Sequence, residues 1–246
     1  MNGSRQSCSL ISGSRLDFGS PPPRALFTPA ELRIIDRVRT PLEAQGFVNR
    51  LPYNIEPEPG KATGRSFRGV VRHHTAHCRE AAVSIAVILE QHGYPPTVMS
   101  LESIDGLDHV IFIYRARTGW GSVARSRDPG LHGRRPVFRS LRALALSYFE
   151  EYIDTTGCVK GYGAVDLRVL GRYDWRFSER NTWAVEQLLY DIPHRSIRSS
   201  ERRVNRLRTR YFRFRREHPG VKPLHYYDRS TWTEIPAHFR SVETPR

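Results

Sequence analysis

The sequence predicts an α+β fold, in which a buried helix packs on an antiparallel sheet and further helices follow. Two observations support this. Residues 81–89 are almost wholly apolar, which is typical of a central helix. Residues 97–127 then include runs rich in β-branched and aromatic residues that are separated by turn signals, as in strands joined by tight turns. With 246 residues, of which 39% are hydrophobic, the chain is long enough for one core.

The N-terminal part of the chain divides into a tail and a helix. Residues 1–27 are rich in Ser, Gly and Pro and predict a disordered tail. Over 28–47, Thr28 as N-cap, Pro29 and Glu31 predict a surface helix. Residues 49–71 contain many Pro and Gly residues and predict a loop.

The central helix is predicted over 76–92, with Thr75 as its N-cap and Gly93 ending it. The elements expected after it are strands over 97–103, 109–117 and 120–127, a helix over 140–153, a strand over 161–170, and helices over 178–192 and 201–217. We expect residues 28–194 to form the main domain. Residues 195–246 are expected to be a basic helical extension packed on it.

The number of cysteines and the hydropathy of the chain indicate the cellular compartment and whether the chain enters a membrane. The three cysteines, Cys8, Cys78 and Cys158, are too few and too scattered for a disulfide framework, which favours a reducing, cytoplasmic setting. No run approaches the roughly 20 apolar residues that a membrane helix needs. We therefore expect no membrane insertion.

Cys78 lies where a His-rich stretch meets the apolar helix. In the first turn of a helix, free N–H groups and the helix dipole stabilise a thiolate, the nucleophilic form of cysteine. His109 opens one predicted strand and Asp128 closes the next. If the strands pair about a turn at 118–119, His109 and Asp128 lie opposite one another. This order predicts a Cys-His-Asp site for acyl transfer.

Several short motifs carry a family resemblance over 72–136. They are "HGYPP" at 92–96, "DHVIFIY" at 108–114, "GW" at 119–120 and "RDP" at 127–129. With the order helix-Cys, strand-His, strand-Asp, they resemble the transglutaminase-like superfamily of papain-like thiol enzymes. The resemblance implies a papain-like fold and a protein or peptide substrate. It also implies Cys78 as nucleophile, His109 as general base and acid, and Asp128 as the carboxylate that orients His109.

Each member of this triad also has an ordinary structural interpretation: a buried thiol, a strand-end histidine and an Asp-Pro turn. Their joint placement favours the triad. The backbone N–H of Cys78 is the expected first oxyanion donor. Candidates for a second donor are Gln45, Tyr53 and Asn54, although each is also consistent with a loop hydrogen bond. His77 and Trp120 are candidates for the mouth of the site.

A metal site is a weaker interpretation of "HHTAHC" at 73–78. His73 and His77 are four residues apart, but Thr75 as cap places His73 outside the helix, and no second cluster completes four ligands. We expect neither a metal nor another cofactor.

The segment 195–216 contains ten arginines and one acidic residue, Glu201, within a chain of formal charge +14. Arg206, Arg210 and Arg213 on the predicted helix are candidates for a basic surface that binds nucleic acid or another anionic partner. A solvated helix face is an equally good interpretation.

The predicted function is a cysteine-dependent amide hydrolase or acyltransferase that works through a thioacyl-enzyme at Cys78. Peptidase, amidase, deamidase and transglutaminase chemistry share the steps up to this intermediate. Two alternatives stay open. The chain can be a catalytically inactive binding module of the same fold, or a protein that binds an anionic partner through the helix at 201–217.

Overall fold

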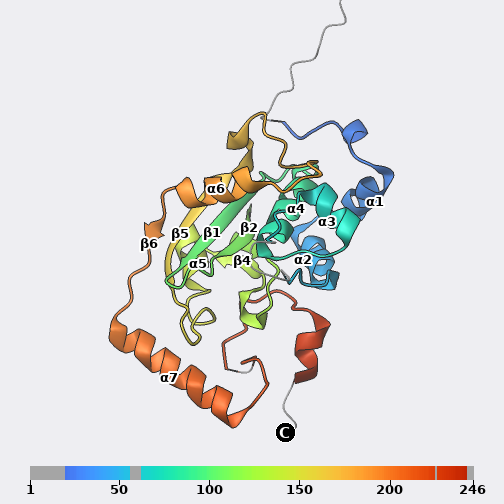
Figure 1. Ribbon diagram of the computed structural model, residues 1–246. Helices are drawn as coiled ribbons and strands as arrows, with labels where there is room; N and C mark the ends of the chain where they lie inside the picture. The colour runs from blue at the N-terminus through green and yellow to red at the C-terminus, as the bar shows by residue number, and fades with distance from the viewer. Residues whose placement is uncertain (1–19, 56–61, 225, 243–246) are drawn as a thin grey trace, which may run out of the picture.

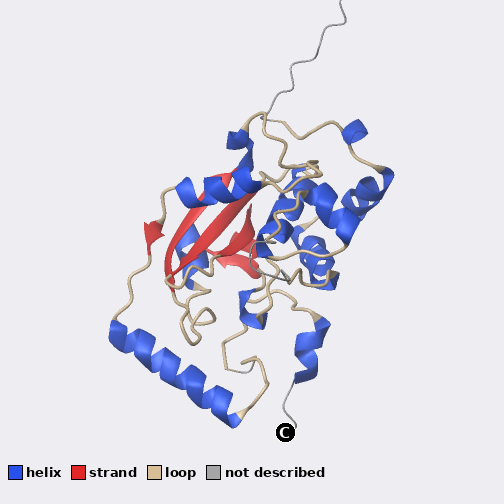
Figure 2. Ribbon diagram, in the orientation of Figure 1, coloured by secondary structure: helices blue, strands red, loops and turns tan. Residues whose placement is uncertain are grey.

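The computed structural model describes residues 20–55, 62–224 and 226–242. The fold is α+β, as predicted, with one six-stranded antiparallel sheet in the order β4-β3-β2-β1-β5-β6 (Figures 1 and 2). The strands are β1 Thr97–Ser103, β2 His109–Ala116, β3 Gly119–Val123, β4 Arg134–Phe138, β5 Val159–Asp166 and β6 Arg195–Ser196. The α-helices are α1 Pro29–Arg37, α2 Pro41–Arg50, α3 Phe67–His73, α4 Cys78–Glu90, α5 Leu141–Leu146, α6 Trp183–Asp191 and α7 Glu201–Glu217.

The sheet separates two hydrophobic clusters, because side chains alternate along each strand. Val110 and Phe112 of β2 face a cluster that contains α4 and residues of α1, α2, α3 and α6. Ile111 and Ile113 face a second cluster, which contains α5, residues 148–153 and Leu207 of α7. Helices therefore cover both faces of the sheet, and the strand predicted over 109–117 is confirmed by β2 (Figure 1).

Helix α4 is the central helix, and every residue from Arg79 to Glu90 is buried. It begins two residues later than predicted, with His77 rather than Thr75 as its N-cap. The cause is tertiary: Ala76 forms a parallel β-bridge with Tyr53, which keeps the backbone extended up to His77. Cys78 is therefore the first helical residue. Gly93 has a φ of +83° just beyond the helix, in agreement with the predicted C-terminal position.

The helical region near the N-terminus differs from the prediction in two places. The single helix expected over 28–47 is two helices, because Thr40 and Glu43 form a capping box that starts α2 anew at Pro41. Helix α3, capped by Ser66, lies in the segment expected to be a loop. Strand β4 was not predicted either.

The predicted tail at 1–27 falls mostly outside the described residues. The prediction is wrong for its last residues, which are ordered on the domain. Residues 24–26 form a 3-10 helix, and Phe27 is buried with its ring against Phe67 and Phe177. Phe27 is therefore part of the first core cluster.

The C-terminal region returns to the domain after α7. Leu207 and Val204 join the second cluster, and a third cluster forms around Leu224, Tyr227 and Trp232. The predicted helix over 201–217 is confirmed by α7. In the described part of the chain, no helix is both long and apolar enough to span a bilayer.

Candidate functional site

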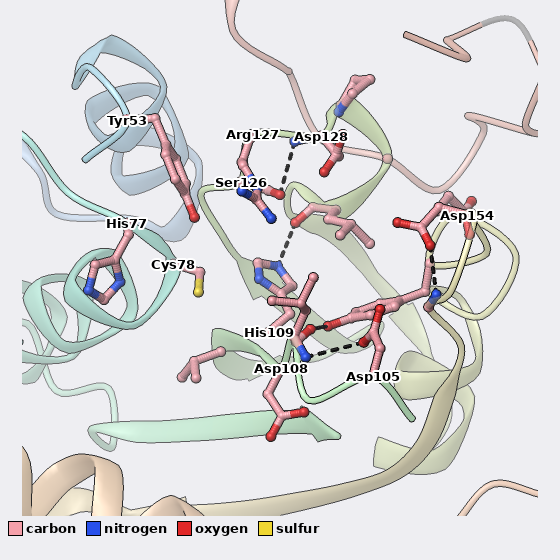
Figure 3. A pocket seen from close by; sticks show the side chains of 18 of the residues that line it. Tyr53, His77, Cys78, Asp105, Asp108, His109, Ser126, Arg127, Asp128 and Asp154 are labelled. Atoms are coloured by element: carbon pink, nitrogen blue, oxygen red, sulfur yellow. Dashed lines mark hydrogen bonds between the residues drawn. The ribbon is translucent and has the colours of Figure 1, made fainter. Parts of the chain in front are cut away.

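Cys78 and His109 lie together because α4 packs on β2. Cys78 is the first residue of α4, and His109 is the first residue of β2. Figure 3 shows the Cys78 sulfur between the rings of His77 and His109. The structure therefore brings together the two residues predicted to be nucleophile and base, and adds a second imidazole.

The ring of His109 is fixed by a backbone carbonyl. His109 is 3% exposed, and its Nε2 lies 2.7 Å from the carbonyl oxygen of Leu131. A carbonyl oxygen only accepts hydrogen bonds, so Nε2 carries the hydrogen. This leaves Nδ1 as the nitrogen that carries the lone pair in the neutral ring.

Electrostatics at the site favour a thiolate. Burial alone would raise the pKa of the Cys78 thiol. Hydrogen bonds from His109 and His77, and the charge on both rings, hold that pKa well below its usual range. Partly exposed Cys78 is therefore suited to act as a nucleophile, whereas burial raises the pKa of the Cys158 thiol.

Asp128 does not contact His109. Its carboxylate pairs with Lys222, which follows α7. The predicted opposition of the two residues is also shifted: Phe112 pairs with Val123, so extending this register places Ser126 opposite His109. The predicted hydrogen bond between Asp128 and His109 is therefore absent, and the Leu131 carbonyl is in its place.

Buried polar groups hold the loop that presents this carbonyl. Fully buried Arg134 donates to the carbonyl oxygens of Gly130 and His132, at 2.7 and 3.0 Å. The Nδ1 of His132 lies 3.1 Å from the Asp128 carbonyl oxygen. Burial and the nearby Arg125 charge lower the pKa of His132 to about 3, so its ring is neutral at pH 7. These hydrogen bonds hold the loop that carries the Leu131 carbonyl.

Two of the three candidates for the second oxyanion donor form hydrogen bonds with other groups. The Gln45 amide donates to Asn49 and to the carbonyl of Ala124, and accepts from the N–H of Ala124. The Asn54 amide donates to Thr63 and to Glu80. Neither amide side chain is aimed at the thiol.

Tyr53 is the candidate that points into the site (Figure 3). Its bridge to Ala76 aligns it with the start of α4, and its phenol points toward Cys78 (Figure 3). Burial first, and then the negative charge of Cys78, raise the pKa of Tyr53, so the phenol keeps its proton. Tyr53 O–H and Cys78 N–H are therefore neighbouring donors beside the sulfur.

Of the two mouth candidates, only His77 lines the pocket. Trp120 lies on β3 opposite Arg115, whose guanidinium is 5.7 Å from the ring centre, and packs against the second cluster. The pocket has a volume of about 760 Å³. Its lining includes the carboxylates of Asp105, Asp108 and Asp154, and the basic side chains of Arg127, Arg215 and Lys222.

The candidate basic residues lie on α7. Arg206 and Arg213 are exposed. Arg210 is turned back toward the protein: its guanidinium donates to the carbonyl of Tyr226 and stacks on that ring at 4.2 Å. Within the described residues, no group of three or more His, Cys, Asp or Glu side chains is arranged to hold a metal ion.

Sequence reasoning missed two groups at this site. The Leu131 carbonyl carries no signal in the sequence, because any residue has one. Glu80 does carry a signal in the sequence. It is three residues after the N-cap His77, in the position where a carboxylate accepts a hydrogen bond from the N-cap N–H.

No family model matches the chain, and no curated protein matches it. Among solved structures, calcium-bound LapG of Legionella pneumophila is similar over 65% of this chain and 87% of its own, with 12% sequence identity and a TM-score of 0.34. A likeness with a TM-score this low carries no argument about the chemistry of the site.

The contacts of the thiol predict its reactivity. Iodoacetamide should label Cys78 well below the ordinary thiol pKa of about 8.5, because the thiolate persists at lower pH. His109→Ala should raise the pH at which labelling begins. Peptide mass spectrometry of labelling rates between pH 5 and 9 measures both, with Cys158 as the internal control. Equal rates at Cys78 and Cys158 in the folded wild type would contradict the prediction.

The position of Asp128 predicts that its charge matters little to the thiolate. Asp128→Asn should leave the pH dependence of Cys78 labelling close to that of the wild type, because His109 is held by the Leu131 carbonyl. The same labelling series measures this effect. A shift as large as that of His109→Ala would show that Asp128 orients His109 in solution.

Proposed function

We propose that this chain is a thiol enzyme that transfers an acyl group from an amide through a thioacyl intermediate on Cys78. The observation that carries the proposal is a partly exposed cysteine at a helix N-terminus, which lies between two imidazoles and lines a large pocket. Each feature favours the thiolate or admits a substrate. Together they are the requirements for covalent catalysis by cysteine.

The proposed reaction begins with attack of the Cys78 sulfur on the amide carbonyl carbon. The C–S bond forms as negative charge develops on the carbonyl oxygen, and the donors proposed for that charge are Cys78 N–H and Tyr53 O–H. Collapse breaks the C–N bond, and an imidazolium gives its proton to the leaving amine. Water or an amine then attacks the thioester, with His109 as the base, and Cys78 is released.

The substrate class is proposed to be a protein or peptide. A pocket of about 760 Å³, lined by both carboxylates and basic side chains, suits a polar segment better than a small apolar ligand. Hydrolysis, deamidation and amine transfer differ only in the group that leaves and the group that attacks the thioester. The fate of the acyl group therefore depends on which acceptor reaches the pocket.

The proposal predicts a covalent adduct on Cys78. Wild-type protein incubated with a mixed peptide library and stopped in acid should gain the mass of an acyl group at Cys78, and hydroxylamine should release it. Cys78→Ser should lose thioester formation, whereas the matched Cys158→Ser variant should retain it. Intact-protein and peptide mass spectrometry provide the measurement. A reactive Cys78 that never acquires an adduct would instead support a catalytically inactive binding module.

A second candidate function rests on the outer face of α7. Exposed arginines recur there at helical spacing, and they extend into solvent rather than back onto the domain. This set, the α7 arginine stripe, consists of Arg202, Arg206, Arg213 and Arg216. It lies opposite the side of α7 that packs through Leu207. We propose that the stripe binds the phosphate backbone of a nucleic acid.

The stripe predicts salt-dependent binding. Replacing its four arginines with Gln should weaken binding of a fluorescent DNA duplex and make log K less steep against log salt, by about 0.9 for each phosphate no longer neutralised. Anisotropy titrations at several salt concentrations measure the slope. Cys78→Ala should have no effect, and Arg210→Gln should have less effect than any stripe variant. Salt-independent binding, or no binding at low salt, would exclude this function.

A further inference from the structure

Arg127 is a charged residue of the pocket that the proposed reaction does not use. It lies in the loop after β3, its side chain is exposed, and it lines the pocket. Figure 3 shows this side chain extending from the loop into the pocket that contains Cys78 and His109. Within the described part of the chain, its guanidinium has no hydrogen bond or ion pair. Its N–H donors are therefore available to a group that enters the pocket.

The other cations that line the pocket already have partners in the protein. Lys222 pairs with Asp128, which follows Arg127 in the chain. Arg79 forms an ion pair with a carboxylate of α6 at 3.0 Å. Arg215 donates to a backbone carbonyl after α7, also at 3.0 Å.

The carboxylates of the pocket have partners as well, because each accepts a hydrogen bond or pairs with a cation. Asp105 accepts from Ser103 Oγ at 2.6 Å and from Thr156 Oγ1 at 2.9 Å. Asp108 accepts from the N–H of Ser103 at 2.8 Å. The other carboxylates with such partners are Asp128, Glu151, Asp154 and Glu186. Among the Asp, Glu, Lys and Arg side chains that line the pocket in the described residues, Arg127 is therefore the one without a protein partner.

The backbone that carries Arg127 is held on both sides. Buried Arg125 donates to the carbonyl oxygen of Ser126 at 2.6 Å. The N–H of Asp128 donates to Ser126 Oγ at 3.1 Å. Because the extended register places Ser126 opposite the proposed base, Arg127 directly follows that position. The loop thus fixes where the side chain begins, while the guanidinium stays exposed.

From these contacts we infer that Arg127 binds a carboxylate of the substrate, so that the proposed enzyme selects amides with a carboxylate close to the scissile bond. A guanidinium presents paired N–H groups whose spacing matches the two oxygens of a carboxylate. That carboxylate belongs either to an Asp or Glu side chain or to the C-terminus of a peptide. The inference rests on the proposed function, and it makes Arg127 a specificity-determining residue.

The acidic residues of the pocket make the position of a substrate carboxylate important. Elsewhere in the pocket, an anion meets the charges of Asp105, Asp108 and Asp154. At Arg127 it gains hydrogen bonds and an opposite charge. Because the guanidinium is exposed, this gain should weaken as the salt concentration rises.

The first test compares two alkylating agents of the same shape. Iodoacetate carries a carboxylate where iodoacetamide carries an amide, next to the carbon that the Cys78 sulfur attacks. Arg127→Gln should lower the ratio of the iodoacetate rate to the iodoacetamide rate at Cys78 about fivefold at low salt. Arg127→Lys keeps the charge but not the paired N–H groups, so it should retain part of the ratio. Peptide mass spectrometry measures both rates, at pH 7 and at pH 9, where a thiol of ordinary pKa also reacts.

Arg215→Gln is the matched control for this test. It removes the same charge from the lining of the pocket, at a residue that already has a protein acceptor. It should change the ratio by less than about twofold. An equal fall in both variants, or no fall in Arg127→Gln, would overturn the inference. Neither result depends on whether Cys78 forms a thioester.

The second test identifies the source of the carboxylate. Wild-type and Arg127→Gln proteins are incubated with two matched pairs of peptide mixtures. One pair has a central Asp or a central Asn, and the other has a C-terminal carboxylate or a C-terminal amide. Acylation of wild-type Cys78 should be faster with the acidic member of one pair, which gives the source. Arg127→Gln should remove this preference without slowing acylation by the neutral members.

The outcomes distinguish this inference from the proposed function. If no peptide acylates Cys78 but the iodoacetate ratio falls as expected, the proposed function fails and the carboxylate site stands. If all four mixtures acylate wild-type Cys78 equally, the proposed function stands and the inference is overturned. A uniform loss of rate in Arg127→Gln would also overturn it, because that result indicates a role in the reaction of every substrate.

Discussion

The packing of α4 on the sheet is the constraint on which the rest of the site depends. Because every residue from Arg79 to Glu90 is buried, the helix cannot rotate or slide without exposing apolar surface. Its first residue, Cys78, is thereby fixed next to the first residue of β2, His109. The bridge between Tyr53 and Ala76 defines where the helix begins and brings a phenol to the same point. One packing interaction thus positions the thiol, one imidazole and a hydrogen-bond donor.

The charged and polar groups around Cys78 are the second feature that determines the properties of the site. Hydrogen bonding and charge from two imidazoles lower the pKa of the Cys78 thiol. The two rings have different partners at Nε2: a carbonyl oxygen for His109, and a carbonyl oxygen with the nearby carboxylate of Glu80 for His77. Glu80 is tolerated in the interior because four donors surround it.

The C-terminal region contributes to the site rather than only following it. Lys222 pairs with Asp128 and, together with Arg215, lines the pocket. Trp232 packs on the guanidinium of Arg134, which holds the loop that presents the Leu131 carbonyl. These contacts explain why Asp128 is turned away from His109: a lysine outside the segment that carries the resemblance competes for its carboxylate. The outward arginines of α7 are separate from this network.

The sequence by itself determined the α+β fold, the buried helix and the strand that begins with His109, because apolar periodicity and helix-end signals are local. The start of α4, the register that places Ser126 opposite His109, and the partners of Gln45, Asn54 and Asp128 were decided only by the tertiary structure. Each depends on groups distant in sequence, such as Tyr53 for the helix start and Lys222 for Asp128. Hydrogen bonds and ion pairs select partners by proximity in space, and periodicity does not encode that proximity.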